Sequence, residues 1–430
     1  MTEHHNSLGV AIVGFGTVGQ SVARLVCAGA HPSLRLSHIC NRQVDRKRAE
    51  TSWVPSDVVW TDDIEVVLSS DTDVVVELIG GVDPATDWTR RALQSGKSVV
   101  TANKQVIAHH GAQLLDVAAE HHRYLGFEAA VAGGIPIIHG VREGLAGDSL
   151  LRVLGILNGT CNYILTRMEA DDVAFDDALL EAQTLGFAEA DPTADVDGFD
   201  AQAKIAILSA VAFGRQIDVT DIPLRTIRTI ESIDFMYARR LGCTIRQVAR
   251  ADASDEVSDG VRASVQPTLV PLSSALARVE GSRNVVVVEG AFGGEFVFSG
   301  FGAGGNPTAV AVVSDLEAIA RGIGNARHDR GLVKARVVRD FVAPHYLRFV
   351  VSDRPGIIAA LANVFSGHGV NIDSVLQEPG WSKTELPFVV TLEACDSSAV
   401  EQTLQESAAF DFNVRPPLWM PVLVSGERHQ

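Results

Sequence analysis

The stretch "EADPTADVDGFDAQAK", residues 189 to 204, places a group of carboxylates just before a lysine, Lys204. The acids are Glu189, Asp191, Asp195, Asp197 and Asp200. Residues four apart on a helix lie on one face, so Asp200 and Lys204 are expected to be neighbours. A lysine positioned among acids can donate a proton to a reacting oxygen. An Asp–Lys pair on a solvent-exposed helix after a turn is the alternative explanation of the same pattern.

A second lysine, Lys104, belongs to the stretch "VVTANKQVIA", residues 99 to 108. The apolar residues before it predict a buried strand, and Lys104 follows the carboxyl end of that strand. Ligands of open α/β sheets bind at this edge, so Lys104 is a candidate cation for a bound ligand. An ordinary lysine at the start of a helix would give the same pattern.

A glycine-rich turn near the N-terminus predicts a dinucleotide site. The turn follows the first apolar run, "GVAIVGF", and precedes the helical pattern "QSVARLVCAGA". Its residues are Gly14, Phe15, Gly16, Thr17, Val18 and Gly19. Glycine lets the backbone approach a pyrophosphate at a helix N-terminus. A tight turn that binds no ligand is the alternative.

The end of the second predicted strand indicates which dinucleotide is bound. NAD sites usually carry an acid there, which binds the ribose 2′-hydroxyl. This chain has Asn41 and Arg42 instead, and the basic residues Arg46, Lys47 and Arg48 follow. A guanidinium suits the 2′-phosphate of NADP, which a carboxylate would repel. NADP is therefore favoured, NAD stays open, and a solvated basic loop is the alternative.

Composition limits the classes of partner. The chain has 430 residues, 46% of them hydrophobic, which predicts two or three domains with buried cores. A net charge of −17 argues against nucleic acid or an anionic membrane as the main partner. Five cysteines without metal-ligand spacing predict reduced thiols. With no apolar stretch of signal or transmembrane length, we expect a cytoplasmic protein.

The elements that must hold these residues follow from hydrophobic patterning. Over the first 130 residues, short apolar runs alternate with helical patterns, which predicts a parallel α/β sheet of Rossmann type. Residues 346 to 425 follow the order strand, helix, strand, strand, helix, strand, which is the ferredoxin-like motif. The fold class is therefore α/β, with an α+β domain between a Rossmann-like domain and a ferredoxin-like domain.

The motifs, in this order, resemble those of homoserine dehydrogenases over roughly residues 9 to 425. They are "AIVGFGTVG", "VVVELIGG", "TANKQVIA", "EAAVAGGIPII", "NGTCNYIL", "LGFAEADPTADVDGFDAQAK" and "GAGGNPTAVAVVSDL". The resemblance implies reversible reduction of L-aspartate 4-semialdehyde to L-homoserine with NADPH or NADH. The chain departs from the family pattern at Phe301 and at Asn41, and the second departure leaves the choice of nicotinamide open.

The resemblance also implies roles for individual residues. Glu189 and Asp200 would hold the polar groups of the substrate, and Lys204 would donate the proton as hydride arrives. Lys104 would bind the cofactor or the substrate, and a share in proton transfer stays open. Gly186 and Gly302 would approach the cofactor.

In the same family, a turn binds a monovalent cation such as Na⁺ through backbone carbonyls. The matching positions are Glu128, Val131, Gly133 and Ile135. Backbone oxygens suit a hard cation, although a purely structural turn is the alternative.

The C-terminal stretch "LRFVVSDRPGIIAALANVFSGHGVNIDSVLQ" resembles an ACT regulatory domain. The resemblance implies that a small amino acid, with threonine as the expected effector, binds where two such domains pair. The matching residues are Asp353, Arg354, Gly356, Asn371 and Ile372. A domain that only dimerises is the alternative.

Four parts are therefore expected, in a homodimer or a homotetramer. They are a nucleotide-binding domain (1–130), a catalytic and dimerisation domain (131–310), a return segment packing on the nucleotide domain (311–345) and an ACT domain (346–430). The competing hypothesis is a nucleotide-binding amino-acid sensor without catalysis. The combination of Lys104, Glu189, Asp200 and Lys204 argues against it, because a sensor needs no proton donor.

Overall fold

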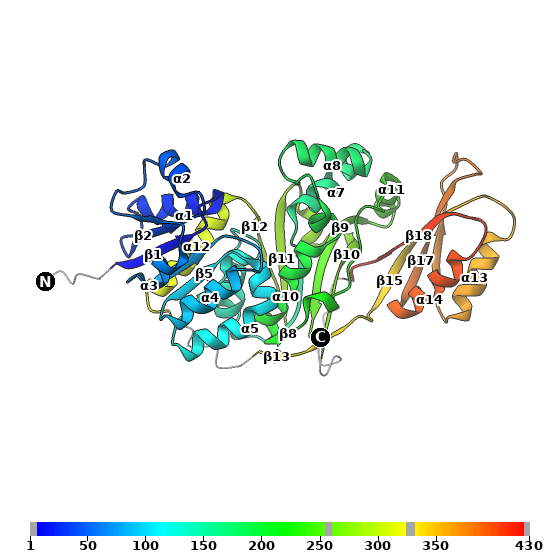
Figure 1. The fold of residues 1–430 in the computed structure, drawn as a ribbon. Coiled ribbons are helices and arrows are strands. Elements are labelled where there is room, and N and C mark those ends of the chain that lie inside the picture. The colour runs from blue at the N-terminus through cyan, green and yellow to red at the C-terminus, as the bar shows by residue number, and fades with distance from the viewer. Residues whose placement is uncertain (1–6, 254–259, 324–331, 425–430) are drawn as a thin grey trace. The chain divides into compact units, whose positions relative to one another are not determined.

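The computed structural model describes residues 7–253, 260–323 and 332–424 (Figure 1). The chain forms two compact units, each assembled from three separate segments. The first unit contains Met1–Val153, Ala203–Asp221 and Val288–Arg336. The second unit contains Leu154–Gln202, Ile222–Val287 and Val337–Gln430.

The first unit is built on a parallel six-stranded sheet with the order β3-β2-β1-β4-β5-β6. Its strands are β1 (Leu8–Val13), β2 (Leu34–Cys40), β3 (Val59–Thr61), β4 (Val74–Glu77), β5 (Ser98–Thr101) and β6 (Leu125–Gly126). Nearly all residues of β1, β4 and β5 are buried, as the continuous apolar runs predicted for strands covered on both faces. The connection after β1 leads to β2 on one side of β1, whereas the connection after β3 leads to β4 on the other side. A ligand crevice is therefore expected at the carboxyl ends of β1 and β4.

Helices connect these strands. They are α1 (Thr17–Cys27), α2 (Val44–Glu50), α3 (Ile64–Ser69), α4 (Ala85–Gln94) and α5 (Lys104–Glu120). A sixth helix, α12 (Gly305–Ala320), comes from far along the chain and lies beside α1 (Figure 1). Buried Ala309, Val312 and Leu316 of α12 pack with Val10 and Ile12 of β1. The chain therefore returns to cover the nucleotide-binding sheet.

After β6 the chain passes through short helical turns, η1 (Glu128–Ala130), α6 (Ile137–His139) and η2 (Gly140–Gly144). A mixed sheet follows, with the order β12-β11-β7-β9-β10-β14. Its strands are β7 (Leu150–Ile156), β9 (Cys243–Asp252), β10 (Gly260–Pro271), β11 (Arg283–Gly290), β12 (Gly294–Phe301) and β14 (Arg336–Val338). Two short strands, β8 (Arg215–Gln216) and β13 (Val333–Lys334), pair in parallel apart from it.

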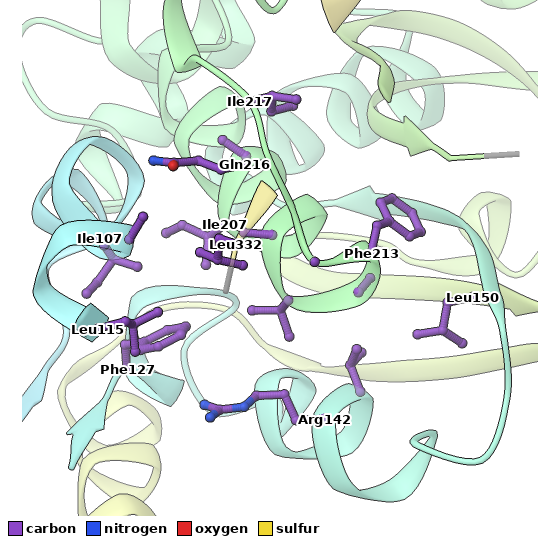
Figure 2. Close-up of a pocket in the computed structure, with 18 of the residues that line it drawn as sticks. Ile107, Leu115, Phe127, Arg142, Leu150, Ile207, Phe213, Gln216, Ile217 and Leu332 are labelled. Carbon is purple, nitrogen blue, oxygen red and sulfur yellow. The ribbon is translucent and has the colours of Figure 1, made fainter. Parts of the chain in front are cut away.

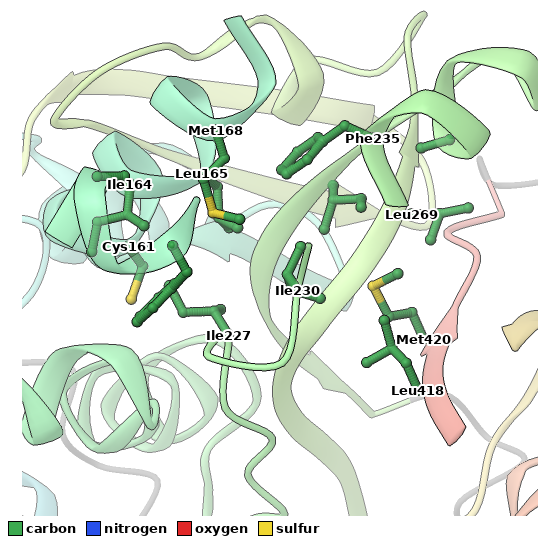
Figure 3. Packing of buried hydrophobic residues seen from close by; sticks show 14 of the residues in the cluster. Cys161, Ile164, Leu165, Met168, Ile227, Ile230, Phe235, Leu269, Leu418 and Met420 are labelled. Atoms are coloured by element: carbon green, nitrogen blue, oxygen red, sulfur yellow. The ribbon is translucent and has the colours of Figure 1, made fainter. Parts of the chain in front are cut away.

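The helices of this middle part carry the acidic stretch. They are α7 (Gly159–Asp171), α8 (Phe175–Thr184), α9 (Thr193–Val196), α10 (Phe199–Phe213) and α11 (Ser232–Arg240), with short turns η3 (Val219–Asp221) and η4 (Leu276–Arg278). Helices α7 and α11 pack on β9, and α8 packs on α7. Their shared core includes Ile245 of β9 together with Cys161, Leu165 and Phe235 (Figure 3).

The C-terminal part forms an antiparallel sheet with the order β16-β17-β15-β18. Its elements are β15 (Val342–Val351), α13 (Ile357–Gly367), β16 (Ile372–Leu376), β17 (Leu386–Asp396), α14 (Ser397–Ala408) and β18 (Asn413–Pro421). This is the strand and helix order predicted from the sequence, so the ferredoxin-like motif is confirmed. The α/β fold class with its three kinds of sheet is confirmed as well.

The two faces of the C-terminal sheet belong to different cores. Successive side chains of a strand point to opposite faces. Leu347 and Phe349 of β15 pack in the core beneath α13 and α14. Tyr346 faces the other way and joins the core of α7 and α11. Leu418 and Met420 of β18 belong to the same core (Figure 3). The expected boundary at residue 346 therefore falls inside a strand whose second face is part of the neighbouring core.

Within the described part of the chain, none of the helices is long and apolar enough to cross a bilayer.

Candidate active site

The glycine-rich turn between β1 and α1 requires glycine at two positions. Gly14 has a φ of 104°, and a Cβ there would lie 2.6 Å from the carbonyl oxygen of Leu78, which follows β4. A Cβ at Gly19 would lie 2.2 Å from the carbonyl oxygen of Gly14. Gly16, by contrast, is exposed and faces open space, and no side chain caps α1 from this position. The turn thus leaves backbone N–H groups at the start of α1 accessible, which fits a pyrophosphate.

The side chains of this turn play different parts. The Phe15 ring is fully buried and packs edge-on against Trp60 at a centroid distance of 5.2 Å. Only the backbone of Phe15 can therefore meet a ligand, and its N–H donates to Asn41 Oδ1 at 3.2 Å. Thr17 is exposed at the first position of α1, and Val18 packs partly into the core beneath.

The basic residues after β2 divide into two kinds. Arg46 and Lys47 of α2 both pair with Glu50, at 2.8 and 3.6 Å. Arg42 lies before α2 with an exposed side chain, and it makes no ion pair with any described residue. Arg48 is likewise exposed and without an ion pair to a described residue, but Arg42 follows the end of β2 by only two residues. Arg42 is therefore the best placed of these cations to meet a ligand at the carboxyl end of that strand.

The loop before α12 reaches the same helix start. A Cβ on Gly305 would lie 2.9 Å from the Thr17 side chain, and Ser21 of α1 bonds Asn306 at 3.0 Å. Gly302 lies three residues earlier, with its carbonyl oxygen 2.6 Å from where a Cβ on Gly133 would be. Gly302 is thus in a loop that touches the nucleotide turn.

Gly186 lies in the second unit and has a structural reason to be glycine. It follows the C-terminus of α8 with a φ of 77°, and its N–H donates to the Gln183 carbonyl at 3.0 Å. This is the left-handed residue that commonly ends a helix. Its expected approach to the cofactor stays a prediction.

Each of the two candidate lysines stands near the start of a helix. Lys104 is the first residue of α5, where the Asn103 side chain caps the helix by accepting from Val106 N–H at 3.3 Å. Lys204 is in the second turn of α10, and both lysines are half-buried. Ile107 and Ile207, one helical turn after each lysine, line the same cavity of about 630 Å³ (Figure 2). Helices α5 and α10 therefore face one another within the first unit.

This cavity is lined largely by apolar side chains, and neither lysine is among them. Figure 2 shows Leu115, Phe127 and Phe213 around it, with Arg142 at one side. Its charged lining residues are Arg142, Glu143 and Asp148, and neither Glu189 nor Asp200 lines it. The cavity therefore lies between the two helices that carry the lysines, and the predicted substrate-binding residues do not form it.

The acidic stretch is structured, because several of its carboxylates accept specific hydrogen bonds. Asp191 Oδ1 accepts from Thr193 N–H at 3.1 Å and so starts α9. Asp197 accepts from Thr226 Oγ1 at 2.6 Å and from Arg228 Nε at 3.1 Å. Glu189 is exposed in the loop before α9. Asp200 occupies the first turn of α10, so Lys204 lies one turn further on, as the spacing predicted.

Asp195 and Asp200 share one partner, Asn158. Its Nδ2 donates to Asp195 Oδ1 at 2.7 Å and to Asp200 Oδ2 at 2.9 Å. Sequence reasoning gave Asn158 no role, although it opens the stretch "NGTCNYIL" directly after a strand. An asparagine between a strand and a helix is a common N-cap, and that signal could have marked it.

The turn expected to bind a cation is buried. Gly133 has a φ of 51°, and the Ile135 carbonyl accepts from Ile137 N–H at 2.7 Å. The Glu128 carboxylate accepts from the N–H groups of Ile138 and His139, at 2.9 and 2.7 Å. Burial raises the pKa of Glu128 to about 7, an effect that these two hydrogen bonds partly offset. Its carboxylate thus shapes the turn, while the backbone carbonyls would be the ligands.

The expected effector residues are not all close together in one chain. Asp353, Arg354 and Gly356 follow the end of β15, where Val351 pairs with Leu386 of β17. Ile372 begins β16, where it pairs with Leu392 of the same β17. These two partners are six positions apart, which corresponds to about 20 Å along a strand. A single domain therefore has Asp353, Arg354 and Gly356 at one end of its sheet and Asn371 and Ile372 at the other.

A Rossmann-like sheet with a glycine cradle at its switch point, beside helices that carry lysines, defines an NAD(P)-dependent oxidoreductase. Three family models match consecutive parts of the chain. They are "Homoserine dehydrogenase, NAD binding domain" (residues 14–128), "Homoserine dehydrogenase" (136–316) and "ACT domain" (345–407).

Whole-chain relatives agree. The homoserine dehydrogenase of Mycobacterium tuberculosis is 40% identical over 92% of this chain and 93% of its own. That of Bacillus subtilis is 36% identical over 91% and 92%. The crystal structure of a homoserine dehydrogenase from Thiobacillus denitrificans superposes with a TM-score of 0.89 at 32% identity, covering 97% of this chain and 98% of that one. The chain belongs to the homoserine dehydrogenase family, is an NAD(P)-dependent enzyme of amino-acid biosynthesis and carries an ACT domain.

Proposed function

We propose that this homoserine dehydrogenase prefers NADPH, that Lys204 is its proton donor and that threonine regulates it through the ACT domain. The observation that carries the catalytic part is the position of Lys204, one helical turn after Asp200. Asp200 is itself held by Asn158 at 2.9 Å, so the start of α10 is anchored where the substrate would bind.

The bound nicotinamide would supply hydride to the carbonyl carbon of L-aspartate 4-semialdehyde. Lys204 then gives a proton to the carbonyl oxygen, which becomes the hydroxyl of homoserine. Asp200 and Glu189 bind the polar groups of the substrate, including its ammonium. Lys104 offsets negative charge on the substrate carboxylate or on the cofactor.

A direct assay separates catalysis from the competing sensor hypothesis. Addition of L-aspartate 4-semialdehyde to the purified protein with NADPH should lower the nicotinamide absorbance in a saturable way. Homoserine with NADP should raise it. A chain that binds NADPH tightly but turns over neither pair would be a sensor.

The preference for NADPH rests on Arg42. Removal of a hydrogen bond to a charged group costs about 1.5–3 kcal/mol, so Arg42→Ala should weaken NADPH binding by that amount. NADH lacks the 2′-phosphate and should bind almost unchanged. Isothermal titration with both cofactors measures this, with Arg46→Ala as the control because Arg46 already pairs with Glu50 at 2.8 Å. Equal losses for NADPH and NADH would place Arg42 at the pyrophosphate or in the fold.

The proposal that NADPH is the cofactor is supported by a related solved structure, a hyperthermophilic archaeal homoserine dehydrogenase in complex with NADPH. It superposes with a TM-score of 0.63 at 28% identity, over 74% of this chain and 98% of that one. We also propose that a monovalent cation such as Na⁺ binds the buried turn through the carbonyls of Glu128, Val131, Gly133 and Ile135.

The register of the C-terminal sheet indicates how an effector such as threonine would have to be bound. Because its two sets of expected effector residues lie about 20 Å apart, a single domain would not surround an amino acid with both. Two domains paired side by side would bring the Asp353 turn of one toward Asn371 of the other. We therefore propose an effector site formed by two copies, in a homodimer or a homotetramer located in the cytoplasm.

A short segment, Ile222–Glu231, offers a route from this domain to the acidic stretch. Arg225 stacks over the Trp419 ring of β18 at 3.8 Å and pairs with Glu401 of α14 at 2.9 Å. The next residue, Thr226, bonds Asp197 at 2.6 Å. A shift of the C-terminal sheet would thus act on the stretch that holds Asp195 and Asp200.

Threonine should raise the semialdehyde concentration required, or lower turnover, by about 5- to 150-fold, the usual range of coupling between sites. The intact chain must be used, because deletion from residue 346 would cut through β15 and open the core around Met420. Arg225→Ala should reduce this response while threonine still binds, as measured by calorimetry. If the intact enzyme ignored millimolar threonine, the domain would be better explained as a dimerisation module.

A further inference from the structure

Asn158 stands between the strand β7 and the helix α7, and its side chain is almost completely buried, at 4% exposure. Its Oδ1 accepts from the N–H of Cys161 at 2.8 Å, which caps the N-terminus of α7. Its Nδ2 donates to Asp195 and Asp200 at 2.7 and 2.9 Å. One amide thus connects three elements, α7, α9 and α10.

The chemistry of the group allows only one orientation. An amide offers two N–H donors on one side and an acceptor oxygen on the other. Turning it over would place the oxygen against two carboxylates and the NH₂ group against the N–H of Cys161. Both N–H groups of the Asn158 amide therefore donate to carboxylates. This shared donor holds the negative charges of Asp195 and Asp200 near each other.

We propose that Asn158 is the positioning residue that orients Asp200 for substrate binding. This inference rests on the proposed role of Asp200 in the site. Asp200 lies in the first turn of α10, and a fixed Asp200 also fixes the start of the helix that carries Lys204. Without the amide, Asp195 and Asp200 would repel each other across a partly buried space, and Asp200 would leave its orientation.

The test compares Asn158→Ser with a matched change on the same helix. A serine at 158 can still cap α7 but lacks the amide donors. Asn162, one turn later on α7, is equally buried, and its Nδ2 donates only to backbone carbonyls, those of Val279, Gly281 and Arg283. Asn162→Ser therefore removes a buried amide without touching the acids.

Loss of a hydrogen bond to a charged group predicts a fall of about 10- to 100-fold in kcat/KM for the semialdehyde in Asn158→Ser. KM for NADPH should stay within about two-fold. Asn158→Asp should be worse than Asn158→Ser, because it keeps the cap but puts a third carboxylate beside two others. Asn162→Ser should lower the melting temperature and leave both kinetic constants near those of the parent.

A double variant decides whether Asn158 acts through Asp200. If it does, Asn158→Ser combined with Asp200→Ala should be no slower than Asp200→Ala alone. Fully additive losses would overturn the proposal, as would equal kinetic losses in Asn158→Ser and Asn162→Ser. If Asp200→Ala alone kept full activity, the proposed role of Asp200 would fail instead, and the positioning role with it.

Discussion

Replacement of Lys204 by alanine should lower kcat by about 10²–10⁴-fold, the usual contribution of general acid–base catalysis. The dissociation constant of NADPH should change little, because Lys204 is not among the residues expected to bind the cofactor. Stopped-flow measurement of NADPH oxidation gives the first number, and titration of nucleotide fluorescence gives the second.

Two further variants identify which lysine donates the proton. Lys204→Arg retains the positive charge but holds its proton too tightly to donate it readily, so it should be nearly as slow as Lys204→Ala. Lys104→Ala should act mainly on KM if Lys104 only binds substrate or cofactor. Should Lys204→Ala stay within a few-fold of the parent while Lys104→Ala loses turnover, Lys104 would be the donor.

The second large effect is expected where the ACT domain meets α11. Asp234 is fully buried, and Arg348 Nε and the Tyr346 hydroxyl each donate to its Oδ1 at 2.8 Å. Burial raises the pKa of Asp234, and the positive charge of Arg348 opposes that shift. Arg348 also pairs with Glu231 at 2.8 Å, so its guanidinium pairs with two acids at the N-terminus of α11.

Arg348→Met should destabilise the protein by about 3–5 kcal/mol, because it leaves a buried carboxylate without its cation. Urea denaturation gives the loss, and hydrogen exchange should place it in α11 and β15. Asp234→Leu combined with Arg348→Met should recover most of the stability, since a buried ion pair and an apolar pair of similar volume are often close in energy. If Arg348→Met were as stable as the parent, protonation of Asp234 or an entering water molecule would have to remove the cost of the unpaired carboxylate.

Much of the architecture could be predicted because its cause is local. The three consecutive valines at residues 74 to 76 predicted a strand covered on both faces, and β4, in which every residue is buried, is such a strand. The Asp200–Lys204 spacing predicted one helical face for the same reason. A periodic pattern acts on its own few residues and does not depend on which elements become neighbours.

Other features depended on contacts between distant residues. β3 (Val59–Thr61) was not predicted, because a three-residue strand carries little pattern and forms by pairing with β2. Phe15 was included in the predicted dinucleotide turn with no role for its side chain, which packs against Trp60, 45 positions further along the chain. This packing depends on the tertiary structure, because Trp60 of β3 reaches Phe15 only when β3 and β2 pair beside β1.

By itself, the sequence determined the alternation of strands and helices over the first 130 residues and the element order of the C-terminal part. It also determined the glycine turn and the placement of Lys204 one turn after Asp200. These depend on hydrophobic period, backbone freedom and helical spacing, all properties of short segments. Only the tertiary structure decided that Asn158 holds Asp195 and Asp200, which follow it by 37 and 42 positions. It also decided that the residues expected to bind an effector lie at opposite ends of a sheet and that Tyr346 belongs to a neighbouring core. The physical reason is that strand register and buried hydrogen-bond partners are set by which elements meet, and many pairings satisfy the same local pattern.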